Sequence, residues 1–276
     1  MNIAITGAGG MLGQALCRAL AKHHVSALSS QDLDITSLSA ARRVFSDLDP
    51  DWIVHTAAFT DVGAAESNYL EAHRVNALGT RNISVAAAEN NSRLIYFSTD
   101  YVFDGALKRP YREWDPTAPL NQYGYSKLAG ECFVRSLCPA HLIIRTSWLF
   151  GPGGLNFVGN ILARAKEKGE LQVVNDQRGS PTFTIDLAYM TLCLLEGDKR
   201  GIYHVTNSGD CSWYEFSREI ISQSGINVEI SPIVSSDLPN AVPRPSQSVL
   251  ENFSLKLERI PLLRPWTHAL AAFLNG

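Results

Sequence analysis

The chain has 276 residues, of which 45% are hydrophobic and 18% are charged, and its net charge is −3 at pH 7. This composition is ordinary for a globular α/β protein, fills one large or two unequal domains, and excludes a disordered chain. Because no Lys/Arg cluster occurs, nucleic acid is not an expected partner. No apolar run approaches the ~20 residues that a membrane-spanning helix needs.

The cysteines and the N-terminus bear on compartment and metal content. Five scattered cysteines form no C-x-x-C pair, which disfavours disulfides and metal sites and fits a reducing compartment. The chain enters a strand at once and leaves no room for a signal peptide. We therefore expect a cytoplasmic protein without a metal centre.

The first predicted elements are a strand, a glycine-rich turn and a helix. The apolar run of residues 3–5 leads into Gly7, Gly10 and Gly13, and Leu12, Leu16 and Leu20 then recur at helical spacing. This is the context of a dinucleotide-binding fingerprint, in which glycines let the backbone approach a pyrophosphate at a helix N-terminus. The spacing G-x-x-G-x-x-G is the one typical of short-chain dehydrogenases. A purely structural glycine turn is the alternative interpretation.

Strand-like and helix-like segments then alternate as far as residue 150. Further strands are predicted at residues 25–28, 52–56, 94–98 and 141–146, and amphipathic helical segments at residues 38–48, 64–90 and 123–137. Such alternation indicates βαβ units. The expected fold class is α/β, a doubly wound parallel sheet of Rossmann-like type.

The pattern weakens after Phe150, where residues 151–154 read Gly-Pro-Gly-Gly and indicate a domain seam. Residues 202–206 are predicted to return to the main sheet as a strand. We therefore expect a dinucleotide-binding domain of residues 1–150, completed by a strand and helix from about 170–206. A smaller, discontinuous substrate lobe would comprise about residues 151–169 and 207–276.

Tyr123 and Lys127 lie four residues apart in the third helical segment and hence on one helix face. A nearby ammonium favours a phenolate, so we expect Lys127 to lower the pKa of Tyr123 and make it a usable general acid for an alkoxide. Two alternatives remain: such pairs are common on helix surfaces, and Tyr125 is a second candidate acid, although nothing basic follows it four residues later.

Thr99 follows the strand of residues 94–98 and so lies at a carboxyl end of the predicted sheet, where open α/β sheets bind ligands. Its hydroxyl could hold a substrate carbonyl and stabilise the developing oxyanion. The alternative is a plain turn or cap residue. Taken together, the glycine turn, Thr99 and the Tyr123/Lys127 pair compose one hydride-transfer site.

Cofactor choice depends on the residues after the second strand. An NAD-specific site usually places a carboxylate there, whereas this chain has Ser29, Ser30 and Gln31. The absence of a carboxylate predicts that NADPH and NADH are both accepted, with NADPH modestly favoured. In the alternative, Asp32 folds back to bind the ribose and NADH is preferred.

The chain resembles the extended short-chain dehydrogenase/reductases and, within them, the dTDP-4-dehydrorhamnose reductase family. The resemblance covers nearly the whole length and rests on TGAGGMLG, HTAAFTDVGAAES, RVNALGT, FSTDYVFDG, PLNQYGYSKLAGE, RTSWLFG, VVNDQRGSPT and RPSQSVL. STDYVFDG followed by YGxSKLxGE is its most specific part. His55 stands where relatives usually have Asn.

The resemblance implies a role for each matching residue. It makes Thr99, Tyr123 and Lys127 the catalytic set, and Thr99, Asp100, Trp148 and Arg244 the substrate contacts, with Arg244 at the nucleotide diphosphate. The cofactor-binding residues would be Gly7, Gly10, Met11, Leu12, Gly13, Ser29, Asp34, Ile35, Ala57, Ala58, Phe59, Thr60 and Asn76, together with Tyr123 and Lys127. Asn76 would also order the active-site helix.

The implied function is NAD(P)H-dependent reduction of the 4-keto group of a nucleotide-linked 6-deoxysugar, giving dTDP-L-rhamnose. One alternative is an epimerase or 4,6-dehydratase, although dehydratases of this superfamily place Asp-Glu after the catalytic Thr and this chain has Asp100-Tyr101. Another is a non-catalytic, NADP-binding regulatory subunit. The expected partner is the nucleotide sugar, and the expected assembly is a monomer or a weak homodimer.

Overall fold

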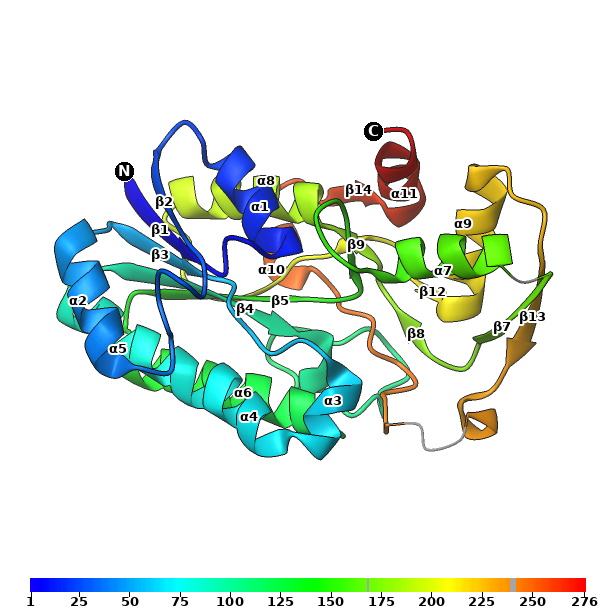
Figure 1. The fold of residues 1–276 in the computed structure, drawn as a ribbon, viewed down its shortest axis with the longest axis horizontal. Helices are drawn as coiled ribbons and strands as arrows, with labels where there is room; N and C mark the ends of the chain where they lie inside the picture. Colours follow the sequence, from blue (N-terminus) through cyan, green and yellow to red (C-terminus); the bar gives the residue numbers. More distant parts are fainter. Residues whose placement is uncertain (168, 239–241) are drawn as a thin grey trace.

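The computed structural model describes residues 1–167, 169–238 and 242–276. Its centre is a six-stranded sheet in the order β10-β5-β4-β3-β1-β2, in which every neighbouring pair is parallel (Figure 1). The strands are β1 (Asn2–Thr6), β2 (His24–Leu28), β3 (Trp52–His55), β4 (Arg93–Thr99), β5 (His141–Thr146) and β10 (Gly201–His204). The strands predicted from the apolar runs are therefore all present, with bounds shifted by at most two residues.

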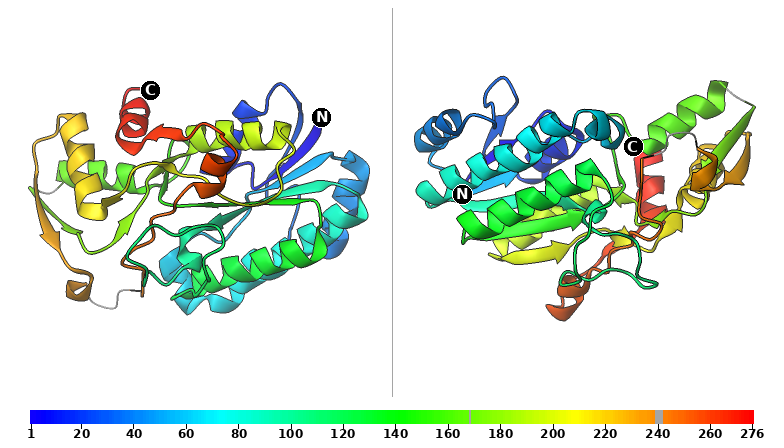
Figure 2. Two further views of the ribbon diagram at one scale, coloured as in Figure 1. Left: turned by 180° about the vertical axis from the view of Figure 1, so that it is seen from behind. Right: turned by 90° about the horizontal axis from the view of Figure 1, so that it is seen from below.

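Helices cover both faces of this sheet. On one face lie α1 (Met11–Ala19) and α8 (Thr184–Glu196); on the other lie α2 (Leu38–Leu48), α5 (Thr80–Glu89) and α6 (Gln122–Leu137). Figure 2 shows α5 and α6 side by side along the second face. The doubly wound, Rossmann-like fold is thus confirmed.

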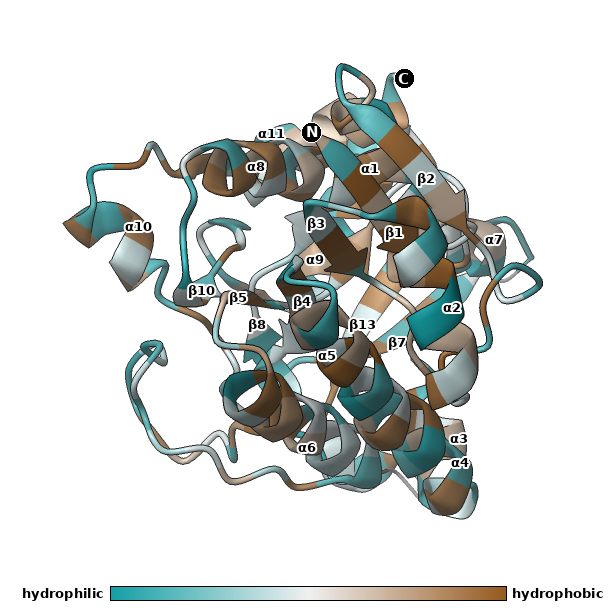
Figure 3. Ribbon diagram, turned by 90° about the vertical axis from the view of Figure 1, so that its left-hand side faces the viewer, coloured by the Kyte–Doolittle hydropathy of each residue, from teal (hydrophilic) through white to brown (hydrophobic). Residues whose placement is uncertain are grey.

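The period-two alternation of the strands explains why two cores form. In β1, Ile3 and Ile5 pack with Leu16 of α1, whereas Ala4 points to the opposite core with Phe45 of α2. Ile3, Ala4 and Ile5 are all buried, as expected for a central strand of a parallel sheet that is covered on both faces. Figure 3 shows the apolar central strands between helices that carry polar residues on their outer sides.

A smaller lobe stands beyond the carboxyl ends of the main strands, on the right of Figure 1. Three of its helices, α7 (Phe157–Glu167), α9 (Trp213–Ser224) and α11 (Trp266–Leu274), contribute to an apolar cluster that includes Phe150, Phe183 and Phe216. Its elements are β6 (Leu149–Phe150), α7 (Phe157–Glu167), β7 (Glu170–Val174), β8 (Arg178–Gly179), β9 (Thr182–Phe183), β11 (Asn207–Ser208), β12 (Cys211–Ser212), α9 (Trp213–Ser224), β13 (Glu229–Ile233), η3 (Ser235–Asp237), β14 (Leu263–Pro265) and α11 (Trp266–Leu274).

Two of the predicted boundaries change. The return to the main sheet begins later than residue 170, because β7 pairs in parallel with β13 of the small lobe and α8 is the first element back on the sheet. Helix α10 (Phe253–Leu257), expected in the small lobe, packs against β10 instead. The chain therefore crosses between the two regions more often than the sequence suggested.

The segment of residues 64–90 is not one helix. It divides into α3 (Val62–Ser67), α4 (Tyr69–His73), the π-helical turn η1 (Arg74–Gly79) and α5. Asn68, whose backbone angles are not helical, separates α3 from α4. The π-helical turn then places an extra residue in the turn that contains Asn76. Such turns occur frequently at functional sites.

In the described parts of the chain, no helix combines the length and hydropathy needed to cross a membrane.

Candidate active site

The glycine turn lies where the strand order reverses. The chain first proceeds from β1 to β2 and then returns across β1 to β3, so the carboxyl ends of β1 and β3 flank the crevice in which such sheets bind ligands. Gly7 follows β1 with φ of +70°, and a Cβ on it would lie 2.6 Å from the Ala57 nitrogen. Only glycine fits this close approach between the two loops.

The turn ends in a helix N-terminus that suits an anion. A Cβ on Gly13 would collide with the carbonyl oxygen of Gly7, so the first turn of α1 lies against the glycine loop. The N-cap residue Gly10 supplies no side-chain cap, and the first turn of α1 has no acidic residue. The unpaired N–H groups and the helix dipole are thus available to a phosphate, and the residues present fit the pyrophosphate of a dinucleotide.

Asn76 positions other residues. Its Oδ1 accepts from the Phe59 nitrogen at 2.7 Å, and its Nδ2 donates to the Phe59 oxygen and to Ser126 Oγ, both at 2.9 Å. Both amide hydrogens are used by the protein. Asn76 therefore ties Phe59 to helix α6 at Ser126, between Tyr123 and Lys127, and its predicted contact with the cofactor stays a prediction.

The predicted adenine-side residues follow β2. Asp34 Oδ1 accepts from the nitrogen and hydroxyl of Thr36 at 2.9 and 2.7 Å, and these bonds hold the pKa of Asp34 below its usual value. Ile35 is buried, and its carbonyl accepts from Asn82 Nδ2 at 3.1 Å. Both residues are fixed in place before any ligand binds, which is the arrangement that a preformed site needs.

The expectation that no carboxylate stands after β2 is wrong. Asp32 folds back, and its Oδ2 accepts from the Ser29 nitrogen at 2.8 Å and from the Ser29 hydroxyl at 2.6 Å. These hydrogen bonds lower the pKa of Asp32, so the exposed carboxylate is ionised at neutral pH. This is the folding back of Asp32 that the sequence left open as the alternative, and a tight turn produces it at the end of the strand.

Thr99 and Tyr123 come together beside a buried carboxyl group. Thr99 ends β4 and caps the short helix η2 (Asp100–Val102), and its side chain lies near enough to the Tyr123 hydroxyl to act on the pKa of Tyr123. Its Oγ1 also lies 3.0 Å from Asp100 Oδ1. Burial raises the pKa of Asp100 to about 7, and in the described residues Asp100 Oδ2 has no hydrogen-bond partner.

The pKa of Tyr123 does not move in the direction expected from Lys127. Burial of the hydroxyl and the nearby Asp100 raise the pKa of Tyr123, while burial lowers the pKa of Lys127 to about 7. The Lys127 ammonium lies 4.3 Å from the centre of the Tyr96 ring. Desolvation, which spacing alone does not reveal, is the largest cause of the rise in the pKa of Tyr123. Tyr123 therefore holds its proton in the ligand-free protein.

Tyr125, the second candidate acid, is 49% exposed and lies on the outer side of α6. Asn121 is the N-cap of α6, the helix that carries both tyrosines. Asn121 Oδ1 accepts from the Gly124 nitrogen at 2.8 Å, and its Nδ2 donates to the Pro243 oxygen at 3.0 Å. The sequence analysis missed this residue, although Asn is a preferred N-cap and precedes the predicted helix.

The remaining substrate-side residues border the same region. Pro243, held by Asn121, precedes Arg244, which is exposed and close enough to lower the pKa of Tyr101 through its charge. Trp148 follows β5 two residues after Thr146, the residue paired with Thr99 across the sheet. Its backbone has φ of +47°, a strained angle for a bulky side chain and one often found at functional sites.

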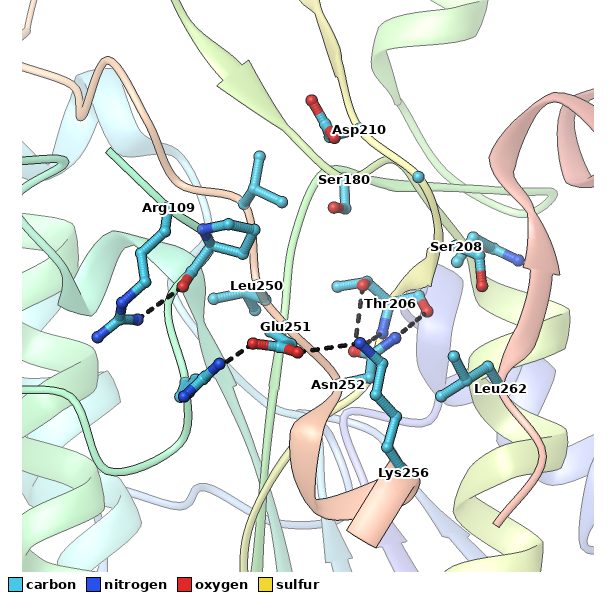
Figure 4. Close-up of a pocket in the computed structure, with 15 residues that line it drawn as sticks. Arg109, Ser180, Thr206, Ser208, Asp210, Leu250, Glu251, Asn252, Lys256 and Leu262 are labelled. Atoms are coloured by element: carbon cyan, nitrogen blue, oxygen red, sulfur yellow. Dashed lines mark hydrogen bonds and ion pairs between the residues drawn. The ribbon is translucent and has the colours of Figure 1, made fainter. Parts of the chain in front are cut away.

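Two cavities lie elsewhere. One of about 440 Å³ is shown in Figure 4, and in it Glu251 accepts from Arg112 and Lys256 at 2.8 and 3.0 Å. The other, of about 610 Å³, includes Trp114 and Arg135 in its lining. Neither is lined by Thr99, Tyr123 or Lys127, and two of the cations of the first are already paired with a carboxylate.

Known proteins match the chain over its whole length. Residues 1–276 match the family described as RmlD substrate binding domain. The spore coat polysaccharide biosynthesis protein SpsK of Bacillus subtilis is 41% identical, over 99% of this chain and 97% of that protein.

Two crystal structures agree with this match. A dTDP-4-dehydrorhamnose reductase of Clostridium acetobutylicum has a TM-score of 0.97 and 39% identity, over 100% of this chain and 99% of that one. A dTDP-4-dehydrorhamnose reductase of Bacillus anthracis, solved in complex with NADP, has a TM-score of 0.96 and 38% identity, over 99% and 98% of the two chains. This chain belongs to the dTDP-4-dehydrorhamnose reductase family.

Proposed function

We propose that this protein is an NAD(P)H-dependent oxidoreductase that reduces the 4-keto group of a nucleotide-linked 6-deoxysugar, converting dTDP-4-dehydro-L-rhamnose to dTDP-L-rhamnose. The observation that carries the proposal is that Thr99 ends β4 near Tyr123, with Lys127 one turn later on α6, and that a glycine turn follows β1 of the same sheet. The names of its relatives, and the NADP bound by one of them, point to the same reaction.

The chain's own residues supply the proton and the stabilisation of charge. Reduction of a ketone leaves negative charge on its oxygen, and the Thr99 hydroxyl is placed to hydrogen-bond that oxygen. Tyr123 then donates its proton. Although burial raises the pKa of Tyr123, an alkoxide is much more basic than a phenolate, so the transfer remains favourable. Lys127, on the same helix face one turn later, stabilises the phenolate that is left.

The glycine turn and the loops that follow β2 and β3 would together bind the whole length of the cofactor. The turn of Gly7, Gly10 and Gly13, with Met11 and Leu12, would bind the pyrophosphate; Ser29, Asp34 and Ile35 would border the adenosine; and Ala57, Ala58, Phe59 and Thr60 would line the path to the reaction site. When bound, the reduced nicotinamide supplies the hydride. Asn76 keeps Phe59 and α6 in register, so that cofactor and acid meet on one side of the sugar.

The two alternative functions are disfavoured by specific residues. A dehydratase needs a second acid after the catalytic Thr and Asp, and Tyr101 occupies that place, with a pKa raised by burial to about 12. A regulatory subunit has no use for a buried Thr/Tyr/Lys set. Monomeric or weakly dimeric assembly and cytoplasmic location stay predictions.

A panel of nucleotide sugars tests the substrate assignment. With NADPH present, the dTDP-linked 6-deoxy-4-keto sugar should raise the melting temperature more than UDP- or GDP-linked sugars, because only a bound ligand stabilises by mass action. Equal protection by all of the nucleotides would show that the site does not read the base or the sugar.

Arg244 is expected to act on substrate binding. An exposed guanidinium that holds a diphosphate contributes equally in the ground and transition states, so Arg244→Ala should raise KM for the nucleotide sugar about 10-fold with little change in kcat. Arg135→Ala, at the rim of the separate cavity, is the matched control. An unchanged KM would return Arg244 to a surface role.

Asp32 is expected to govern the choice between the two cofactors. Its ionised carboxylate stands at the end of β2, where the ribose 2′ group binds, and it opposes a 2′-phosphate. Asp32→Asn should therefore raise kcat/KM for NADPH relative to NADH by about 10-fold, a change of ~1.4 kcal/mol. Steady-state kinetics with each cofactor measure this ratio, and Asp47→Asn on α2 is the control. If the ratio does not change, Asp32 does not face the 2′ position.

A further inference from the structure

Trp148 and Trp213 form a stacked pair at the border between the main sheet and the small lobe. Their ring centres lie 3.4 Å apart and their planes differ by 5°. Both indoles are only partly buried. Trp213 is the first residue of α9, whereas Trp148 comes directly before β6, so the contact joins segments 65 residues apart. Neither the sequence motifs nor the catalytic set assigns a role to Trp213.

The pair holds Trp148 in a backbone conformation that a bulky residue rarely adopts. Trp148 has φ of +47°, and its carbonyl accepts from the Thr182 nitrogen at 3.2 Å. A Cβ on Gly179 would lie 2.6 Å from Trp148 Nε1 and 2.7 Å from Cζ2, so the indole rests against a glycine backbone as well as against Trp213. Strained residues persist only where the surroundings fix them, and these contacts do so.

The short strand pair β8–β12 positions both residues that contact the Trp148 indole, Gly179 and Trp213. Gly179 belongs to β8, which pairs antiparallel with β12, and β12 leads directly into Trp213. Ser212 caps α9 through its bond to the Glu215 nitrogen at 3.0 Å, and this cap fixes the direction in which Trp213 leaves the strand. Phe157 of α7 packs behind Trp213 with ring centres 4.4 Å apart. Trp213 is thus supported on a rigid frame.

We propose that Trp213 is a positioning residue that fixes the Trp148 indole as a wall of the sugar subsite, and so contributes to selection of a deoxysugar. The proposal rests on the proposed function, since it takes Trp148 to border the sugar. A 6-deoxysugar presents a methyl group and C–H faces, and aromatic walls are the usual partners of such apolar surfaces in ligand pockets. Without its stacking partner, Trp148 would leave the strained conformation and the wall would be lost.

The stack is tested first by spectroscopy on the protein without ligands. Two indoles in face-to-face contact give an exciton couplet in circular dichroism. The couplet should disappear in Trp213→Leu and persist in Trp266→Phe, a control in which the indole meets Phe216 edge to face at 5.5 Å instead. A couplet that survives Trp213→Leu would show that the pair does not stack in solution.

Kinetics then test the positioning role. Trp213→Leu should raise KM for the nucleotide sugar about 5- to 10-fold, the scale of one aromatic pair, with KM for NADPH unchanged. Trp213→Phe, which keeps a flat ring, should restore most of the affinity. If Trp213→Leu does not fold, Trp213→Met replaces it with the same expectation.

The outcomes separate this proposal from the proposed function. An inactive wild-type protein would refute the proposed reduction itself. An active wild type whose Trp213→Leu variant has an unchanged KM for the sugar, or an equal rise in both KM values, would refute only the positioning role.

Discussion

Replacing Tyr123 by phenylalanine should lower kcat by about 100-fold or more, the usual scale of general acid catalysis. The Tyr123 hydroxyl is desolvated and lies near Thr99, whereas the other phenol of the first turn of α6, that of Tyr125, is exposed. Phenylalanine keeps the ring and removes only the proton donor. KM for NADPH should stay within a few-fold of its original value, because the substitution does not change the glycine turn that would bind the cofactor.

Tyr125→Phe is the matched control, since the same atom is removed two residues later on the same helix. Tyr125 is half exposed, and its loss should leave kcat nearly unchanged. Single-turnover measurements with saturating NADPH separate the chemical step from product release. If Tyr125→Phe is the more damaging of the two changes, the assignment of the acid is wrong.

Glu131→Gln should destabilise the protein by about 3–5 kcal/mol, the range observed when one partner of a buried ion pair is removed. Glu131 lies one turn after Lys127 on α6, and its two oxygens accept from Arg145 Nε and Nη2 at 2.9 and 2.7 Å. The two side chains are 2% and 3% exposed. The neutral amide would leave the Arg145 guanidinium buried without a countercharge, next to the Phe103 ring at 5.2 Å.

A second ion pair provides the comparison. Glu89 binds Arg42 with the same two-point geometry at 2.7 and 2.6 Å, but both side chains are about half exposed. Glu89→Gln should therefore reduce stability by less than about 1 kcal/mol. Chemical denaturation of the two variants measures the difference. Equal losses would mean that burial does not decide the strength of the Glu131–Arg145 pair.

The main sheet was predictable because its strands are buried on both faces and read as apolar runs. Residues 141–146 and 38–48 were predicted with the bounds that β5 and α2 have. The two-residue strands of the small lobe carry no such pattern. β8 and β12 are strands only because distant segments pair, and a local sequence window contains no record of that pairing.

The site was predictable to the extent that its chemistry depends on spacing. The Tyr123/Lys127 interval and the glycine turn specify which residues share a face, and the structure brings Thr99 to Tyr123. The direction of the Tyr123 pKa shift was not predictable, because burial of a hydroxyl depends on the packing of several elements. The return of Asp32 to Ser29 could be stated only as an alternative for a related reason: it depends on a turn whose hydrogen bonds the strand pattern does not reveal.

Reduction of the keto sugar is the central claim, and oxidation of NADPH with identification of the product tests it most directly. The protein is mixed with NADPH and dTDP-4-dehydro-L-rhamnose, and the sugar is analysed by mass spectrometry and NMR. We predict one NADPH oxidised per sugar, a product heavier by two hydrogen atoms with a hydroxyl at C4, and a rate at least about 100-fold lower with Tyr123→Phe. An isomerised or dehydrated sugar formed without NADPH oxidation, or no turnover at all, would contradict the account.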